Sequence, residues 1–189
     1  MFLVRCEARC DEALAFPARL RAAVRAAAAT VATGERHPPR DAFVLKLDGE
    51  TLAIPYRLRY DPDLLRRELA SSQADARRIL LCLGTRHDDG HVRQECLRQL
   101  LADESSWLTP YLLQLAGEYV VEIAADVAAA IGARNPAALR AFAVENPAYL
   151  AALESRITSY WNCYHRQAYP ERGRYPGTRV VAAVRAAME

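Results

Sequence analysis

The chain has 189 residues, of which 52% are hydrophobic and 25% are charged, and its net charge at pH 7 is +2. This length fits one domain with its own core, and so small a net charge lacks the strong basic bias typical of nucleic-acid-binding proteins. The sequence has no uncharged apolar run of membrane-spanning length and no signal-peptide pattern, and its five cysteines form no CxxC pair. We therefore expect a cytoplasmic protein in a reducing compartment, without a membrane association.

The N-terminal third of the chain predicts a helix followed by a β-hairpin. Between residues 11 and 33, apolar residues recur at helical spacing. The runs 42–47 and 51–60 flank Asp48-Gly49, a dipeptide that suits the positive φ angles of a tight hairpin. Pro55 cannot donate a backbone hydrogen bond, so we expect its strand at the edge of the sheet.

Helix start signals dominate the rest of the chain. Four times, a residue that caps helices precedes a proline, which is favoured at the first helical position. These pairs are Asp61-Pro62, Thr109-Pro110, Asn135-Pro136 and Asn146-Pro147. Together with the apolar periodicity they predict helices near 62–70, 75–85, 91–102, 110–131, 136–144, 147–167 and 179–187. We expect a single domain, 1–189, in which 1–60 form the first helix and the hairpin and 61–189 form a helical core.

The segment 76–101 resembles one unit of the HEAT-type helical repeat. Within 88–100, an aspartate in a turn precedes Val-Arg, then a small residue and a leucine, as in the turn and second helix of that family. The resemblance implies a scaffold for protein contacts, with Asp88 or Asp89 and Arg93 tying neighbouring turns together. The expected fold class is therefore mainly α: an irregular helical bundle or HEAT-like helical pairs with a small N-terminal β-hairpin.

Two pairs of potential metal ligands occur in the central part of the chain. His87 and His91 are four residues apart, and so are Glu118 and Glu122. If the four side chains converged, they would resemble the ligand set of a divalent transition metal. This supports an alternative function, a metal-dependent hydrolase, which we do not favour because such spacing is common and Gly90 interrupts any helix between the histidines.

A structural role is the favoured interpretation of the same cluster. Arg86 or Arg93 can neutralise Glu118 in a partly buried network, since ion pairs also occur in helical interfaces. If instead Glu118, Glu122 and Asp126 form an exposed acidic stripe, they would attract the basic surface of a partner. That stripe supports the hypothesis of an immunity or antitoxin-like protein that binds a basic bacterial effector.

Aromatic residues alternate with arginines in the C-terminal segment 159–177. Aromatic rings can stack on bases while arginine contacts phosphate, so the segment supports a second alternative, an RNA-binding protein. Tyrosine and arginine are also common at protein interfaces. We favour a structural interpretation, in which Tyr160, Trp161 and Tyr164 close the core at the end of a long helix, because the net charge offers little electrostatic affinity for nucleic acid.

The sequence contains no P-loop, nucleophile elbow or Gly-rich dinucleotide turn, so it indicates no enzyme class, and we expect no cofactor. The sequence therefore predicts a non-enzymatic protein–protein interaction module. Its binding residues are expected among Arg86, His87, Arg93, Glu118, Glu122, Asp126, Tyr160, Trp161, Tyr164 and Arg166.

Overall fold

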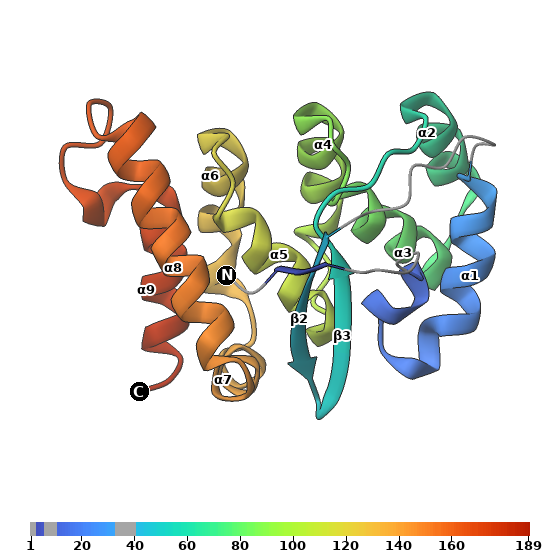
Figure 1. Cartoon of the computed structure of the whole chain (residues 1–189), viewed down its shortest axis with the longest axis horizontal. Helices are drawn as coiled ribbons and strands as arrows, with labels where there is room; N and C mark the ends of the chain where they lie inside the picture. The colour runs from blue at the N-terminus through green and yellow to red at the C-terminus, as the bar shows by residue number, and fades with distance from the viewer. Residues whose placement is uncertain (1–2, 6–10, 33–40) are drawn as a thin grey trace. The chain divides into compact units, whose positions relative to one another are not determined.

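The structure is a computed structural model, and it describes residues 3–5, 11–32 and 41–189, with side chains in the last two ranges. The chain divides into two compact units, which we call the N-terminal unit (2–100) and the C-terminal unit (101–189) (Figure 1). The boundary expected near residue 60 falls inside the N-terminal unit, and the single domain stays a prediction. The fold class is confirmed as mainly α with a small N-terminal β-hairpin.

The N-terminal unit contains the predicted hairpin within a three-stranded antiparallel sheet. Its strands are β1 (Leu3–Arg5), β2 (Asp41–Leu47) and β3 (Glu50–Pro55), in the order β1-β2-β3. Asp48 and Gly49 form the turn, with φ angles of 51° and 80° that suit a tight hairpin. Pro55 ends the edge strand, as its missing N–H predicts. The sequence analysis did not predict β1, and the second predicted strand ends at Pro55, before Tyr60.

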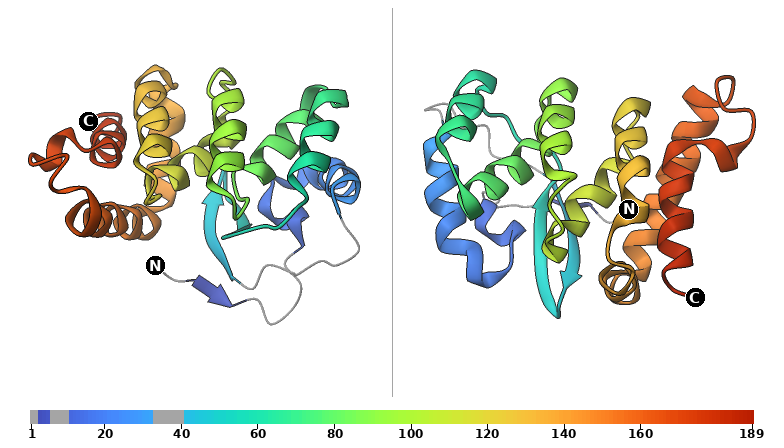
Figure 2. Two further views of the ribbon diagram at one scale, coloured as in Figure 1. Left: turned by 90° about the horizontal axis from the view of Figure 1, so that it is seen from above. Right: turned by 180° about the vertical axis from the view of Figure 1, so that it is seen from behind.

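The other elements of the N-terminal unit, within the residues that the structure describes, are helices and an isolated bridge between Leu58 and His87. The α-helices are α1 (Arg21–Thr30), α2 (Pro62–Ser71), α3 (Ala74–Gly84) and α4 (Gly90–Leu100), preceded by the 3-10 helices Glu12–Ala15 and Ala18–Leu20. The helix predicted at 11–33 is shorter because Pro17, which lacks a backbone N–H, separates the first turns. α3 and α4 lie side by side (Figure 2) and bury Leu80, Leu83 and Leu97. This pair has the predicted helix–turn–helix form.

The C-terminal unit is built of helices. They are α5 (Thr109–Ala116), α6 (Val121–Ala130), α7 (Pro136–Glu145), α8 (Pro147–Tyr160) and α9 (Pro176–Ala186). A π-helix, η5 (Trp161–His165), continues α8, and the 3-10 helices are Ser106–Leu108, Ile131–Ala133 and Arg172–Arg174. The four predicted proline starts are confirmed, although only Asp61 and Asn135 accept the capping hydrogen bond from a backbone N–H.

The continuous helix predicted at 110–131 is wrong, because residues 117–120 separate α5 from α6. A Cβ atom added at Gly117 would lie 2.7 Å from Cδ1 of Leu153 on α8, so the close approach of the two helices requires glycine here. Glycine also weakens a helix, and after it the N–H of Glu118 donates to the carbonyl of Leu115 (3.2 Å). The break places Glu118 outside both helices.

Candidate functional site

His87 lies in the turn between α3 and α4 (residues 85–89) of the N-terminal unit, where both of its ring nitrogens form hydrogen bonds. The N–H of Asp89 donates to Nδ1 (2.9 Å), so Nε2 carries the proton and donates to the carbonyl of Tyr60 (2.9 Å). Oδ1 of Asp88 lies 3.2 Å from the same Nδ1. The buried His87 therefore has no free lone pair for a metal ion.

The same turn is fastened by a buried arginine. Nη1 of Arg93 donates to the carbonyls of His87 and Asp88, both at 2.9 Å. Leu58 adds two backbone hydrogen bonds, from its N–H to the carbonyl of Arg86 (2.8 Å) and from the N–H of Asp88 to its carbonyl (2.9 Å). Arg93 thus holds the turn before its own helix, and the tying of neighbouring turns that the repeat resemblance implied stays a prediction.

Asp89 begins α4, and His91 is exposed on that helix. Oδ1 of Asp89 accepts the N–H of His91 (2.8 Å), and this hydrogen bond holds the pKa of the carboxyl below its usual value. Across residues 11–32 and 41–189, no three His, Cys, Asp or Glu side chains are placed to hold one metal ion. The geometry gives no support to a metal centre on His87, His91, Glu118 and Glu122.

The three acidic residues of the predicted stripe do not share one helix. Glu118 lies between α5 and α6 and is only 4% exposed, whereas Glu122 is exposed in the first turn of α6 and Asp126 is half-buried. The exposed stripe of three carboxylates is therefore wrong. Arg86 and Arg93 belong to the N-terminal unit and Glu118 to the C-terminal unit, so their pairing stays a prediction.

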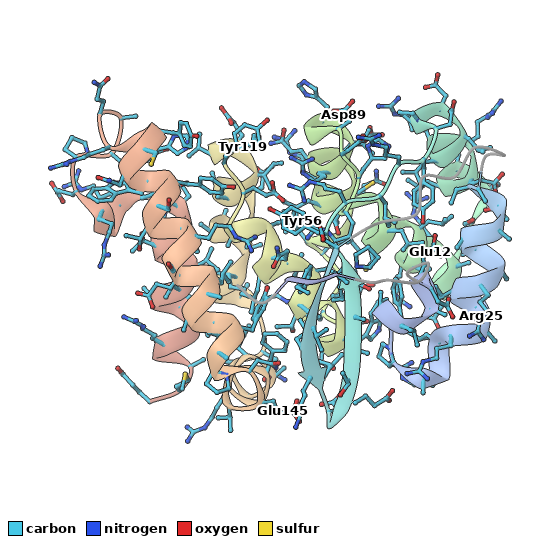
Figure 3. The ribbon with its side chains drawn as sticks, in the orientation of Figure 1. Glu12, Arg25, Tyr56, Asp89, Tyr119 and Glu145 are labelled. Atoms are coloured by element: carbon cyan, nitrogen blue, oxygen red, sulfur yellow. The ribbon has the colours of Figure 1, made fainter. Side chains whose placement is uncertain are left out.

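Aromatic side chains of the C-terminal unit form one connected group, which we call the aromatic cluster. Its rings come from the turn after α5, the end of α8, η5 and the segment before α9. Tyr119, in the turn after α5, is labelled in Figure 3. Ring centroids lie 6.5 Å apart for Tyr119–Tyr160, 6.0 Å for Tyr160–Tyr164, 6.4 Å for Tyr164–His165, 5.4 Å for His165–Tyr175 and 5.6 Å for Tyr169–Tyr175. Trp161 joins through its indole N–H, which donates to the Tyr169 carbonyl (2.8 Å).

The π-helix η5 is held at His165 by one hydrogen bond to a distant residue and one to the residues that follow it. Nε2 of His165 donates to the carbonyl of Tyr119 (2.8 Å), and the N–H of Tyr169 donates to the carbonyl of His165 (2.9 Å). The His165 ring also stacks on Tyr175 at an interplanar angle of 22°. π-turns are uncommon and occur frequently at functional sites. The segment that carries the exposed rings is thus fixed in place.

Much of the aromatic cluster faces solvent. Tyr164 is 70% exposed and Tyr119 is 58% exposed, while Tyr160 and Trp161 are half-buried. The guanidinium of Arg166, also exposed, lies 5.9 Å from the centre of the Trp161 ring. The prediction that these side chains close the core is therefore wrong for Tyr164, whereas for the half-buried Tyr160 and Trp161 it stays a prediction.

Sequence reasoning missed four members of this cluster, Tyr119, His165, Tyr169 and Tyr175. The last three lie within the segment 159–177, so its aromatic spacing was a usable signal. Tyr119 comes from a different part of the chain, and only the folded structure brings it to Tyr160.

An apolar cavity of about 240 Å³ lies among α5, α7, α8 and α9. Leu113, Leu150, Val180 and Val184 are among its lining residues. Its two charged groups, Arg185 and Glu154, pair with each other (2.6 Å). No polar group that lines it is placed to select a ligand.

Comparison of the chain with protein-family models, curated proteins and solved structures finds no match. Within the part of the chain that the structure describes, no helix combines the length and the apolar character needed to span a bilayer. The case for a function therefore rests on the geometry of the described side chains.

Proposed function

We propose that this chain is a non-enzymatic protein-binding module whose interface is the aromatic cluster. One observation carries the proposal: Tyr119 and Tyr164, two of the most exposed large hydrophobic side chains, belong to the same connected group of rings. Tyrosine, tryptophan and arginine are enriched in the energetically important parts of protein interfaces. The arginine over Trp161 adds the third of these residue types.

The rigidity of the cluster strengthens this proposal. Tyrosine loses little conformational entropy on binding, and the loss is smaller when the ring is already held. Here His165 fixes the backbone of Tyr119, and Trp161 fixes the segment at Tyr169. A partner would meet a preformed surface and would spend little of its binding free energy on ordering it.

The narrower form of the proposal, an immunity-type protein that binds a basic bacterial effector, would rest on Glu122 and Asp126 of α6, because Glu118 is buried. The aromatic cluster supports the broader form. We also propose a cytoplasmic location, since Cys82, Cys96 and Cys163 are free thiols.

Affinity capture with matched variants tests the proposed function. The full chain and a Tyr119→Ser/Tyr164→Ser variant are used as baits in extracts of the native cell, and a Leu14→Ser/Val144→Ser variant serves as the control because it removes two exposed apolar residues elsewhere. We expect the tyrosine variant to lose a partner about tenfold or more, with unchanged thermal unfolding, while the control retains it. Equal capture by both variants would contradict the proposal.

A further inference from the structure

Exposed arginines lie in the same chain segment as most of the aromatic cluster. The segment 159–177 contains Arg166, Arg172 and Arg174 against a single acidic residue, Glu171, which leaves two excess positive charges. All three arginines are exposed. Arg174 pairs with Glu171 (3.0 Å), but both side chains are more than two-thirds exposed, and an ion pair in water is easily exchanged.

Two of these arginines have no carboxylate of their own. Within the described residues, Arg166 contacts the Trp161 ring and forms no ion pair, and Arg172 forms none either. The guanidinium group offers a planar set of donors that matches a carboxylate. These two groups are therefore available to an external anion.

A hydroxyl group next to Arg174 in the chain is also without an acceptor. The hydroxyl of Tyr175 is buried and has no hydrogen-bond partner among the residues that the structure describes. Burial, with smaller contributions from Tyr169 and Tyr160, raises the pKa of Tyr175 to about 12, so the group remains a protonated donor at neutral pH. A buried donor without an acceptor is uncommon in folded proteins, and this one lies next in the chain to the exposed Arg174.

We propose that the aromatic cluster recognises an acidic segment of a protein partner, a proposal that rests on the proposed function. Carboxylates of the segment bind Arg166, Arg172 and Arg174. At Arg174 the carboxylate of the partner replaces that of Glu171. An apolar side chain of the same segment packs on the exposed tyrosines. The charges determine which segment binds, and the rings supply the apolar contact area.

The observations favour protein over single-stranded nucleic acid. Bases need open ring faces, whereas the exposed rings meet one another edge-on or tilted, at 71° for Tyr119–Tyr160 and 47° for Tyr160–Tyr164. An excess of two charges also gives little of the counterion release on which nucleic-acid affinity depends.

The test is a selection of displayed random peptides on the full chain, with removal of peptides that also bind the Tyr119→Ser/Tyr164→Ser variant. We expect the enriched peptides to combine aspartate or glutamate with an aromatic or aliphatic residue. Enriched peptides that are neutral or basic would overturn the acidic-segment proposal and leave the protein-binding function standing. Failure to enrich any peptide over the tyrosine variant would contradict both.

Charge reversal distinguishes specific binding by these three arginines from a general effect of net charge. The Arg166→Glu/Arg172→Glu/Arg174→Glu variant should weaken the best selected peptide at least about tenfold. The control, Arg19→Glu/Arg67→Glu/Arg140→Glu, makes the same change in net charge at three exposed arginines elsewhere and should retain binding. Equal loss in both variants would refute specific recognition.

A binding measurement with RNA completes the test. Oligouridine RNA is titrated against the wild type and both arginine variants. We expect weak binding that the two variants reduce equally. Binding tighter than that of the best peptide and lost only in the 166/172/174 variant would assign the surface to RNA and overturn the proposal.

Discussion

The turn between α3 and α4, together with Arg93 of α4, and the aromatic cluster use the same kinds of side chain in opposite ways. At this turn, His87 and Arg93 are buried and bind backbone carbonyls of their own unit. In the aromatic cluster, His165 also binds a carbonyl, but the neighbouring Tyr164 and Arg166 are exposed. A histidine close to an arginine therefore identifies no function by itself. The exposure of the surrounding side chains separates a structural site from a binding surface.

The largest expected effect tests the structural side of this comparison. Arg93→Met removes the hydrogen bonds to the carbonyls of His87 and Asp88 and leaves the carbonyl of the buried His87 without this donor, so the free energy of unfolding should fall by about 3 kcal/mol. Urea unfolding measures this loss. The control Arg67→Met, at an exposed position on α2, should change stability by less than about 0.5 kcal/mol. A loss no larger than that of the control would refute the structural role.

A second substitution tests the packing of α3 against α4 beside the same turn. A Cβ atom added at Gly84 would overlap Sγ of Cys96, so Gly84→Ala should destabilise the chain by about 1–3 kcal/mol. In the Cys96→Ala background the loss should be smaller, because the overlapping sulfur is gone. Gly132→Ala is the control, since an added Cβ there meets nothing within 4 Å. Additive losses at Gly84 and Cys96 would show that the sulfur is not the obstacle.

The charge of Asp89 predicts a smaller, pH-dependent effect. The hydrogen bond from His91 lowers the pKa of Asp89 in the folded state, so its carboxylate stabilises the fold above the unfolded pKa, and this contribution disappears as the pH falls through the folded pKa. Asp89→Asn should therefore be less stable than the wild type at pH 7 and equally stable near pH 2, by urea unfolding at both pH values. A difference that does not change with pH would contradict this assignment.

The smallest expected effect on stability is that of a chemical label on Cys163, which lies in η5 among residues of the aromatic cluster. Cys163 is exposed within η5, whereas Cys82 and Cys96 are buried and burial raises the pKa of Cys96 to about 12. In a Cys6→Ser/Cys10→Ser background, a maleimide should label Cys163 alone and leave the unfolding midpoint unchanged, as mass spectrometry and thermal melts will show. The label should block capture of the partner. Rapid labelling of the buried thiols would contradict the described packing.

Local sequence signals predicted the parts of the fold that depend on neighbouring residues. Asp48-Gly49 indicated the hairpin turn, and the prolines marked the starts of α2, α5, α7 and α8. The break at Gly117 was not predictable, because its cause is a contact with Leu153, far along the chain.

The candidate site was predictable only in part, for a similar reason. Tyr160, Trp161, Tyr164 and Arg166 were identified from their spacing, but their exposure was not. The hydrogen bond that removes His87 from metal chemistry reaches the carbonyl of Tyr60, which no local pattern of sequence indicates. Tertiary hydrogen bonds and burial therefore decide the roles that residue type leaves open.

The π-helix η5 holds one residue more than an α-helical turn in the same place would hold. Removing one residue from it converts the wide turn to an α-turn, so the residues that follow keep roughly the same side of the helix. Deletion of Asn162 would therefore remove the bulge between Trp161 and Tyr164 while His165 still faces the carbonyl of Tyr119. A change of one residue in this turn can thus alter which side chains the surface presents without displacing the segment after it.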